Sequence, residues 1–206
     1  SLKRAYSWMR DQYVLHRHLR SLYSGKAKAW LFDLSREADT QHNLSQWAVS
    51  DWSGLRKRRG PLIAWAAHRG CEISWVDHTP LLAHEKPEVN RTSIDTIIGL
   101  CGLQSLWLRG KMDFAALSED DAPRAARYAF SELNGLPEWF PELALAQPQA
   151  VRDVVKVGLE GEWLIPPDRE HALEVLSKLL WHGEGVRSLI IGDLLVQIQL
   201  EDPRHS

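Results

Sequence analysis

Apolar side chains recur at intervals of three and four positions along most of this chain. Residues at that spacing share one face of an α-helix, whereas a half-buried strand would alternate at every second residue. Proline and glycine interrupt the pattern repeatedly, as at Gly60-Pro61 and at Asn134-Gly135. Because proline suits the first turn of a helix and glycine suits the residue after its last turn, these positions predict helix boundaries.

The predicted helices share an apolar stripe that is bounded by such corners. Gly70 fits a left-handed residue after a helix end, and Ser118, followed by Glu119-Asp120-Asp121, fits an N-cap with acidic residues in the first turn. On this basis we expect helices from Leu2 to Leu22, about Asn43 to Leu55, Pro61 to Arg69, Ser93 to Gly110, Ser118 to Leu133, Pro137 to Ala146, Pro148 to Leu159, Pro166 to Leu180, and Val186 to about Leu200. Ala27–Leu34 is either a short helix or a connection.

The segment Glu72–Asn90 has no sustained period and contains Pro80 and Pro87. We interpret it as a long connection with one helical turn and a short extended piece at Ile73–Val76. Connections of this length are uncommon in compact domains and often carry function.

Helices joined by short proline and glycine corners pack as antiparallel neighbours. The sequence therefore predicts an all-α fold of stacked helical hairpins, similar to an α-solenoid, with an irregular helical bundle as the alternative. We divide the chain into a helical N-terminal part, residues 1–92, and a helical-hairpin array, residues 93–206. The two parts form either two cores or one continuous domain.

Composition narrows the class of protein. The chain has 206 residues, a net charge of −2 and ten tryptophans, which suit the gaps between crossing helices. No stretch reaches the roughly 20 apolar residues of a membrane span, so we expect no membrane association. With only Cys71 and Cys101, a disulfide framework is not expected, which favours the cytoplasm. The chain starts at Ser1, and we expect it to be a piece of a larger multidomain protein.

The run Arg56-Lys57-Arg58-Arg59 is the most distinctive local feature, and Trp52 and Trp65 flank it. Four consecutive cations cannot all face a core, so they could attract phosphates or an acidic partner. The simpler interpretation is a solvated helix end, where cations meet exposed carbonyls. We select Arg56, Lys57, Arg58, Arg59 and Trp75 as candidate binding residues, Trp75 because it stands for exposed aromatic side chains near the long connection.

Candidate catalytic residues gather only in the long connection. Cys71, Asp77, His78, His84 and Glu85 could form an acid–base pocket or a cysteine nucleophile there. Their spacing does not match a zinc site, and no phosphate-binding glycine loop is present, so we expect no metal and no cofactor.

A further pattern lies in the second half of the chain. It consists of Arg124-Ala125-Ala126-Arg127-Tyr128-Ala129 and Glu132-Leu133-Asn134, then Pro137-x-Trp139-Phe140 and Gln147-Pro148-Gln149-Ala150-Val151. Their texture resembles the degenerate HEAT or armadillo-like helical arrays of large multidomain bacterial proteins. Such arrays accompany STAND-type NTPase modules in signalling and defence. The resemblance spans about residues 93–200 and implies a sensing or scaffolding segment, with catalysis elsewhere in the parent chain.

The sequence therefore predicts a non-enzymatic helical domain that recognises a protein partner or neighbouring domains of the same chain. Two alternatives remain open. One is a nucleic-acid-binding domain that uses the basic run, and the other is an enzyme whose pocket lies around residues 71–90.

Overall fold

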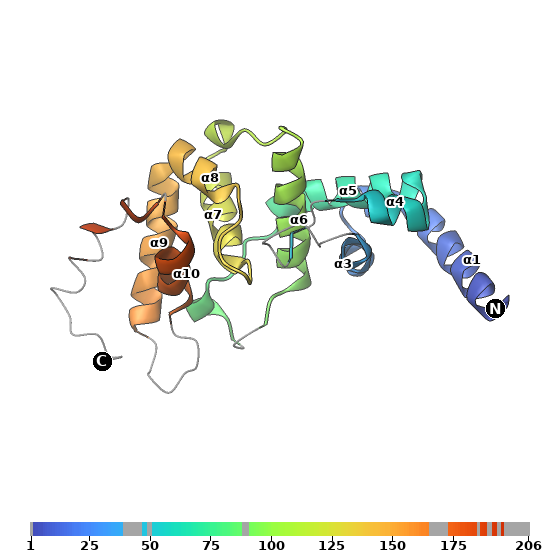
Figure 1. Ribbon diagram of the computed structural model, residues 1–206, viewed down its shortest axis with the longest axis horizontal. Helices are drawn as coiled ribbons and strands as arrows, with labels where there is room; N and C mark the ends of the chain where they lie inside the picture. The colour runs from blue at the N-terminus through green and yellow to red at the C-terminus, as the bar shows by residue number, and fades with distance from the viewer. Residues whose placement is uncertain are drawn as a thin grey trace. The chain divides into compact units, whose positions relative to one another are not determined.

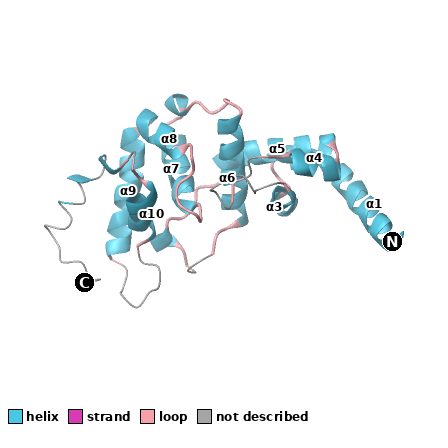
Figure 2. Cartoon of the chain, viewed as in Figure 1, coloured by secondary structure: helices cyan, strands magenta, loops and turns pink. Residues whose placement is uncertain are grey.

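The computed structural model describes residues 2–38, 47–48, 51–87, 91–164, 173–184, 186–188, 191–192 and 195. Every regular element in these ranges is a helix, and no described residue belongs to a strand (Figure 2). The predicted all-α class is thus confirmed for this part of the chain. The expected helix starts at Asn43 and Pro166, and most of the expected last helix up to Leu200, lie outside the described residues.

The helices follow the proline and glycine corners closely, and Figure 1 labels most of the longer ones. In chain order they are α1 (Leu2–Arg17), α2 (Leu19–Tyr23), α3 (Lys28–Glu37), α4 (Ser53–Arg59), α5 (Pro61–Ser74), the 3₁₀ helices η1 (Trp75–Asp77) and η2 (Ala83–Glu85), α6 (Ile94–Leu108), the 3₁₀ helix η3 (Phe114–Ala116), α7 (Asp121–Ser131), α8 (Phe140–Ala146), α9 (Pro148–Trp163) and α10 (Glu174–His182).

The chain forms two compact units. Unit 1 comprises Ser1–His78 and Ser93–Arg109, and unit 2 comprises Thr79–Thr92 and Gly110–Ser206. This division differs from the sequential halves 1–92 and 93–206, because α6 packs with the N-terminal helices while the segment after His78 packs with the later ones. Packing partners, which periodicity does not report, decide the division.

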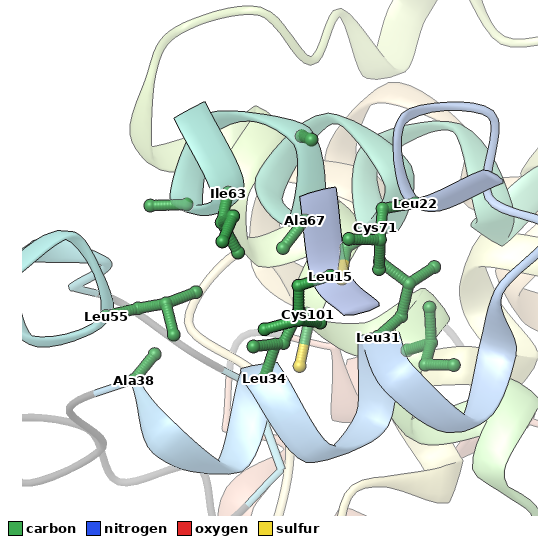
Figure 3. Packing of buried hydrophobic residues seen from close by; sticks show 13 residues of the cluster. Leu15, Leu22, Leu31, Leu34, Ala38, Leu55, Ile63, Ala67, Cys71 and Cys101 are labelled. Carbon is green, nitrogen blue, oxygen red and sulfur yellow. The ribbon is translucent and has the colours of Figure 1, made fainter. Parts of the chain in front are cut away.

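The core of unit 1 gathers aliphatic side chains from six helices (Figure 3). Leu15 and Leu22 meet Leu31 and Leu34, and Cys101 of α6 lies among them. Burying such leucines stabilises a fold by about 1.5–3 kcal/mol each. The members of this cluster are Leu15, Leu22, Leu31, Leu34, Ala38, Leu55, Ile63, Ala64, Ala66, Ala67, Cys71, Ile98 and Cys101.

Glycine lets α5 approach its neighbours closely. A Cβ on Gly70 would lie 2.0 Å from the carbonyl oxygen of Leu22, and a Cβ on Gly102 would lie 2.1 Å from that of Cys71. Gly70 is therefore needed inside α5 for close packing, and the prediction that it ends the helix is wrong. The helix runs on to Ser74, whose hydroxyl donates to the Gly70 carbonyl at 2.6 Å.

The long connection is shorter and more ordered than predicted. Its first residues continue α5 and form η1, so the extended piece predicted at Ile73–Val76 is wrong. Residues 47–48 and 51–52 are also not helical, unlike the predicted helix from Asn43. Asp51 explains where α4 begins, since its Oδ1 accepts the Ser53 amide hydrogen at 2.7 Å and so favours a turn before the helix.

Unit 2 is built around α7, α8 and α9. Tyr128, Trp139 and Phe140 are fully buried, and Phe130 meets Phe140 edge to face at 5.4 Å between ring centroids. Pro148 begins α9 as predicted. The carboxylate of Glu162, near the end of α9, accepts the amide hydrogens of Val175 and Leu176 at 2.5 and 3.2 Å, and so caps the first turn of α10.

Candidate functional site

The basic run forms the second half of α4. Arg56, Lys57 and Arg58 are exposed, and within the described residues they make no ion pair. The guanidinium of Arg58 lies back along its own helix over Gly54. These three side chains are thus exposed to solvent, which is compatible both with a solvated helix end and with a contact to a partner.

Arg59, the fourth cation of the run, behaves differently. Its Nε and Nη2 donate to the two carboxylate oxygens of Glu37 at 2.8 and 2.6 Å, which ties α4 to the end of α3. The hydrogen bond with Glu37 raises the pKa of Arg59 from its ordinary value although burial opposes the charge. Because its guanidinium is already paired, Arg59 is a structural residue, and the available part of the run is Arg56–Arg58.

Trp75 is not an exposed contact residue, which corrects the selection made from the sequence. Only 6% of its surface is exposed. The reason is the continuation of α5 into η1, which places the indole against α6 instead of in an open loop. Trp52 is structural as well, since its Nε1 donates to Ser105 Oγ at 3.0 Å and its ring stacks on His68.

The exposed aromatic residue of this region is Trp65. Its indole is 55% exposed and packs on Tyr23 of α2, which is 39% exposed, with 4.8 Å between ring centroids and an interplanar angle of 31°. Leu62, one turn earlier on the same face of α5, is 46% exposed. From the sequence, Trp65 is recognisable only as a neighbour of the basic run, because periodicity does not show which tryptophan a distant segment covers.

Exposed cations also occur on α2 and on α4, the helix that precedes α5. Arg20 precedes Tyr23 by three positions and is exposed on the same side of α2. Arg58 precedes Leu62 by four positions, so their Cα atoms lie within about 14 Å of each other. We call this set of residues the basic–aromatic surface; it consists of Arg20, Tyr23, Arg56, Lys57, Arg58, Leu62 and Trp65.

Two candidate catalytic residues of unit 1, Cys71 and His78, are held in structural contacts, whereas the third, Asp77, is exposed at the end of η1. Burial raises the pKa of the Cys71 thiol well above its ordinary value, which keeps it protonated and unreactive. His78 Nε2 lies 2.9 Å from Thr96 Oγ1 and 3.3 Å from Ser93 Oγ, at the start of α6. Burial lowers the pKa of His78, so it is neutral at pH 7 and stabilises the turn that leads into that helix.

The candidate catalytic residues of unit 2 are engaged as well. Glu85 accepts two hydrogen bonds from Arg127, and its pKa is lowered although burial opposes ionisation, because Arg127 and the Leu82 amide outweigh burial. The ring of His84 occupies the space where Gly161 has no side chain, with Cγ 2.2 Å from the position of a Cβ. In the described part of this unit, Glu85 is thus held by Arg127 and the His84 ring is packed against Gly161.

The described part of the chain lacks two further features. No group of three or more histidine, cysteine, aspartate and glutamate side chains gathers there in an arrangement that could hold a metal ion. No helix in these ranges is long and apolar enough to cross a bilayer.

Comparison with known proteins leaves the basic–aromatic surface to be interpreted from its own chemistry. No model of a protein family matches the chain, and no curated protein and no solved structure is detectably similar to it.

Proposed function

We propose that this chain is a non-enzymatic helical recognition domain that binds a protein partner through the basic–aromatic surface. The observation that carries the proposal is the exposed Tyr23–Trp65 pair with Leu62 beside it. Removing apolar surface from water stabilises a complex by about 25 cal/mol per Å², so exposed large apolar side chains favour binding to a partner that covers them. Tryptophan, tyrosine and arginine are also the residues that most often dominate protein–protein binding energy.

The states of two candidate catalytic residues, Cys71 and Glu85, support binding over catalysis. A nucleophilic cysteine needs a thiolate, whereas burial keeps the Cys71 thiol protonated. A general acid or base needs an accessible carboxyl with a pKa near neutrality, whereas Glu85 is paired with Arg127 and its pKa is lowered.

A nucleic acid is the alternative ligand, because exposed cations also bind phosphate groups. Single strands bind through stacking of bases on free aromatic faces, with cations along the backbone. The Tyr23 and Trp65 rings lie against each other, which leaves fewer free faces for bases, and the aliphatic Leu62 suits a protein side chain better. A protein partner is therefore the proposal that we develop.

In this proposal the chain is part of a larger multidomain protein of the cytoplasm, in which stacked helices present the surface to a partner or to a neighbouring domain. The resemblance of residues 124–151 to helical arrays of signalling and defence proteins supports that setting. The two cysteines, both free and buried, are compatible with a reducing compartment.

The test is a peptide-display selection against the purified chain, followed by fluorescence anisotropy with the enriched peptides. Trp65→Ser should weaken their binding at least tenfold, because it removes the central aromatic contact. Trp181→Ser is the matched control, since Trp181 is 77% exposed but belongs to unit 2. It should leave binding unchanged.

Three outcomes would contradict the proposal. One is the failure of any peptide to be enriched, and another is equal binding of the enriched peptides to Trp65→Ser and wild type. The third is Trp65-dependent binding of a labelled oligothymidylate that is tighter than that of every peptide, which would favour the nucleic-acid alternative. Circular dichroism of each variant checks that the helices are intact.

A further inference from the structure

The charges of the two units differ in sign. Unit 1 carries 14 Lys and Arg against 8 Asp and Glu, so its net charge is positive. Because the whole chain has a net charge of −2, the net charge of unit 2 is negative. The exposed cations of the basic–aromatic surface come from two separate elements, α2 with Arg20 and α4 with Arg56–Arg58. These exposed positive charges would favour a segment of opposite charge on the basic–aromatic surface.

Several carboxylates of unit 1 are already engaged elsewhere. Glu37 is paired with Arg59, and Asp51 accepts hydrogen bonds from Ser53. Glu72 is buried and accepts from Arg109 at 2.5 Å and from Arg69 at 3.3 Å. These three acidic side chains form ion pairs or hydrogen bonds with other groups. They therefore do not pair with the positive charges of Arg56, Lys57 and Arg58.

We propose that the partner segment recognised by the basic–aromatic surface is acidic and carries large apolar side chains. This inference rests on the proposed function and adds to it the chemistry of the partner. The apolar side chains would cover Leu62 and Trp65, and carboxylates on either side would face Arg20 and the exposed part of α4.

The two contributions affect binding differently. Apolar contact with the indole supplies most of the affinity and depends little on salt. Charge complementarity speeds association and selects acidic over neutral segments, and salt weakens it, because the cations are exposed. The inference thus predicts a preference that is large at low salt and small at high salt.

The experiment uses four labelled synthetic peptides of equal length and measures their anisotropy with the whole chain. One combines glutamate with leucine and phenylalanine, one replaces glutamate by glutamine, one replaces it by lysine, and one keeps glutamate but replaces the apolar residues by serine. The acidic apolar peptide should bind about tenfold more tightly than the glutamine peptide at about 50 mM salt, and the ratio should shrink at about 300 mM.

Two triple variants test the assignment to α4. Arg56→Gln/Lys57→Gln/Arg58→Gln should abolish the preference for glutamate over glutamine while retaining the dependence on Trp65. Arg10→Gln/Lys111→Gln/Lys156→Gln removes the same charge from exposed positions outside the surface and should retain the preference.

The outcomes separate the two proposals. Equal binding of the glutamate and glutamine peptides, both lost in Trp65→Ser, would overturn the acidic preference and leave protein recognition in place. Binding of the serine-substituted acidic peptide as tightly as the apolar one would overturn the need for apolar side chains. If none of the four peptides shows binding that depends on Trp65, the inference is overturned. The display selection then tests protein recognition independently. Tighter binding of oligothymidylate than of the acidic peptide would overturn it in favour of phosphate recognition.

Discussion

Arg127 holds Glu85 through two hydrogen bonds, from Nη1 to Oε2 at 2.6 Å and from Nη2 to Oε1 at 3.0 Å. The same Nη1 also donates to the Pro80 carbonyl at 3.1 Å. Lys86 adds an ion pair with Glu174 at 3.5 Å. A segment that the sequence suggests as an active-site loop is in this way fastened to α7 and α10 of unit 2.

Glu85→Gln should lower the free energy of unfolding by about 1 kcal/mol at pH 7, since the two-bond pair with Arg127 loses its charge. The pKa of Glu85 is lowered from its ordinary value of 4.5, so the pair contributes stability that is present above that pH and lost as pH falls below it. Urea unfolding of both proteins at pH 7 and pH 4 should show a smaller difference at pH 4. An equal difference at both values would contradict the pairing.

Glu162→Gln should show the opposite pH dependence. Burial raises the pKa of Glu162 to about 7 despite the amide hydrogen bonds from α10, so the folded wild type binds a proton that the unfolded chain releases at lower pH. The wild type should therefore lose stability relative to the variant as pH rises from 5 to 8, by about 3 kcal/mol at most.

Urea unfolding at several pH values measures that change. Glu160→Gln, an exposed neighbour on α9, is the matched control and should give the same difference from wild type throughout. If the Glu162→Gln difference is also constant, then Glu162 does not titrate in this range.

Gly102→Ala should destabilise the chain by about 1–3 kcal/mol, because the new Cβ would lie 2.1 Å from the Cys71 carbonyl oxygen and force α5 and α6 apart. Gly54→Ala is the control, since its nearest neighbour is the flexible Arg58 guanidinium at 3.3 Å. It should be neutral or stabilise by about 0.5 kcal/mol through helix propensity. Thermal unfolding that ranks the two variants in the reverse order would refute this account.

Arg59→Gln and Arg58→Gln should affect stability differently, because Arg59 is paired with Glu37 and Arg58 is exposed. The former loses the two-bond pair with Glu37 and should lower the free energy of unfolding by about 1 kcal/mol. The latter should leave stability within about 0.5 kcal/mol of wild type, because Arg58 is exposed. Chemical denaturation of both variants makes the comparison, and equal losses would contradict it.

Cys71 and Cys101 should resist thiol reagents in the folded protein. Both side chains are fully buried, and burial raises the pKa of Cys71. Ellman's reagent should therefore react with both thiols only after denaturation in guanidinium chloride. Rapid reaction of one thiol in the native state would reopen the cysteine-enzyme alternative.

Local pattern accounts for most helix positions. Ser93 caps α6, where its Oγ accepts the Thr96 amide hydrogen at 3.1 Å, and Gly110 follows that helix with a φ of 61°. Pro148 begins α9. Such signals depend on residues a few positions apart, which is why the sequence by itself determined that this part of the chain is helical and where many helices begin and end.

Tertiary structure decided which side chains are available. Gly70 continues α5 because the Leu22 backbone touches it, Trp75 is buried while Trp65 is exposed, and Arg59 is paired while Arg58 is free to meet a partner. Each of these outcomes depends on a contact between segments far apart in the sequence. Periodicity within one helix carries no information about such contacts, so only the packed helices distinguish the exposed basic–aromatic surface from the core.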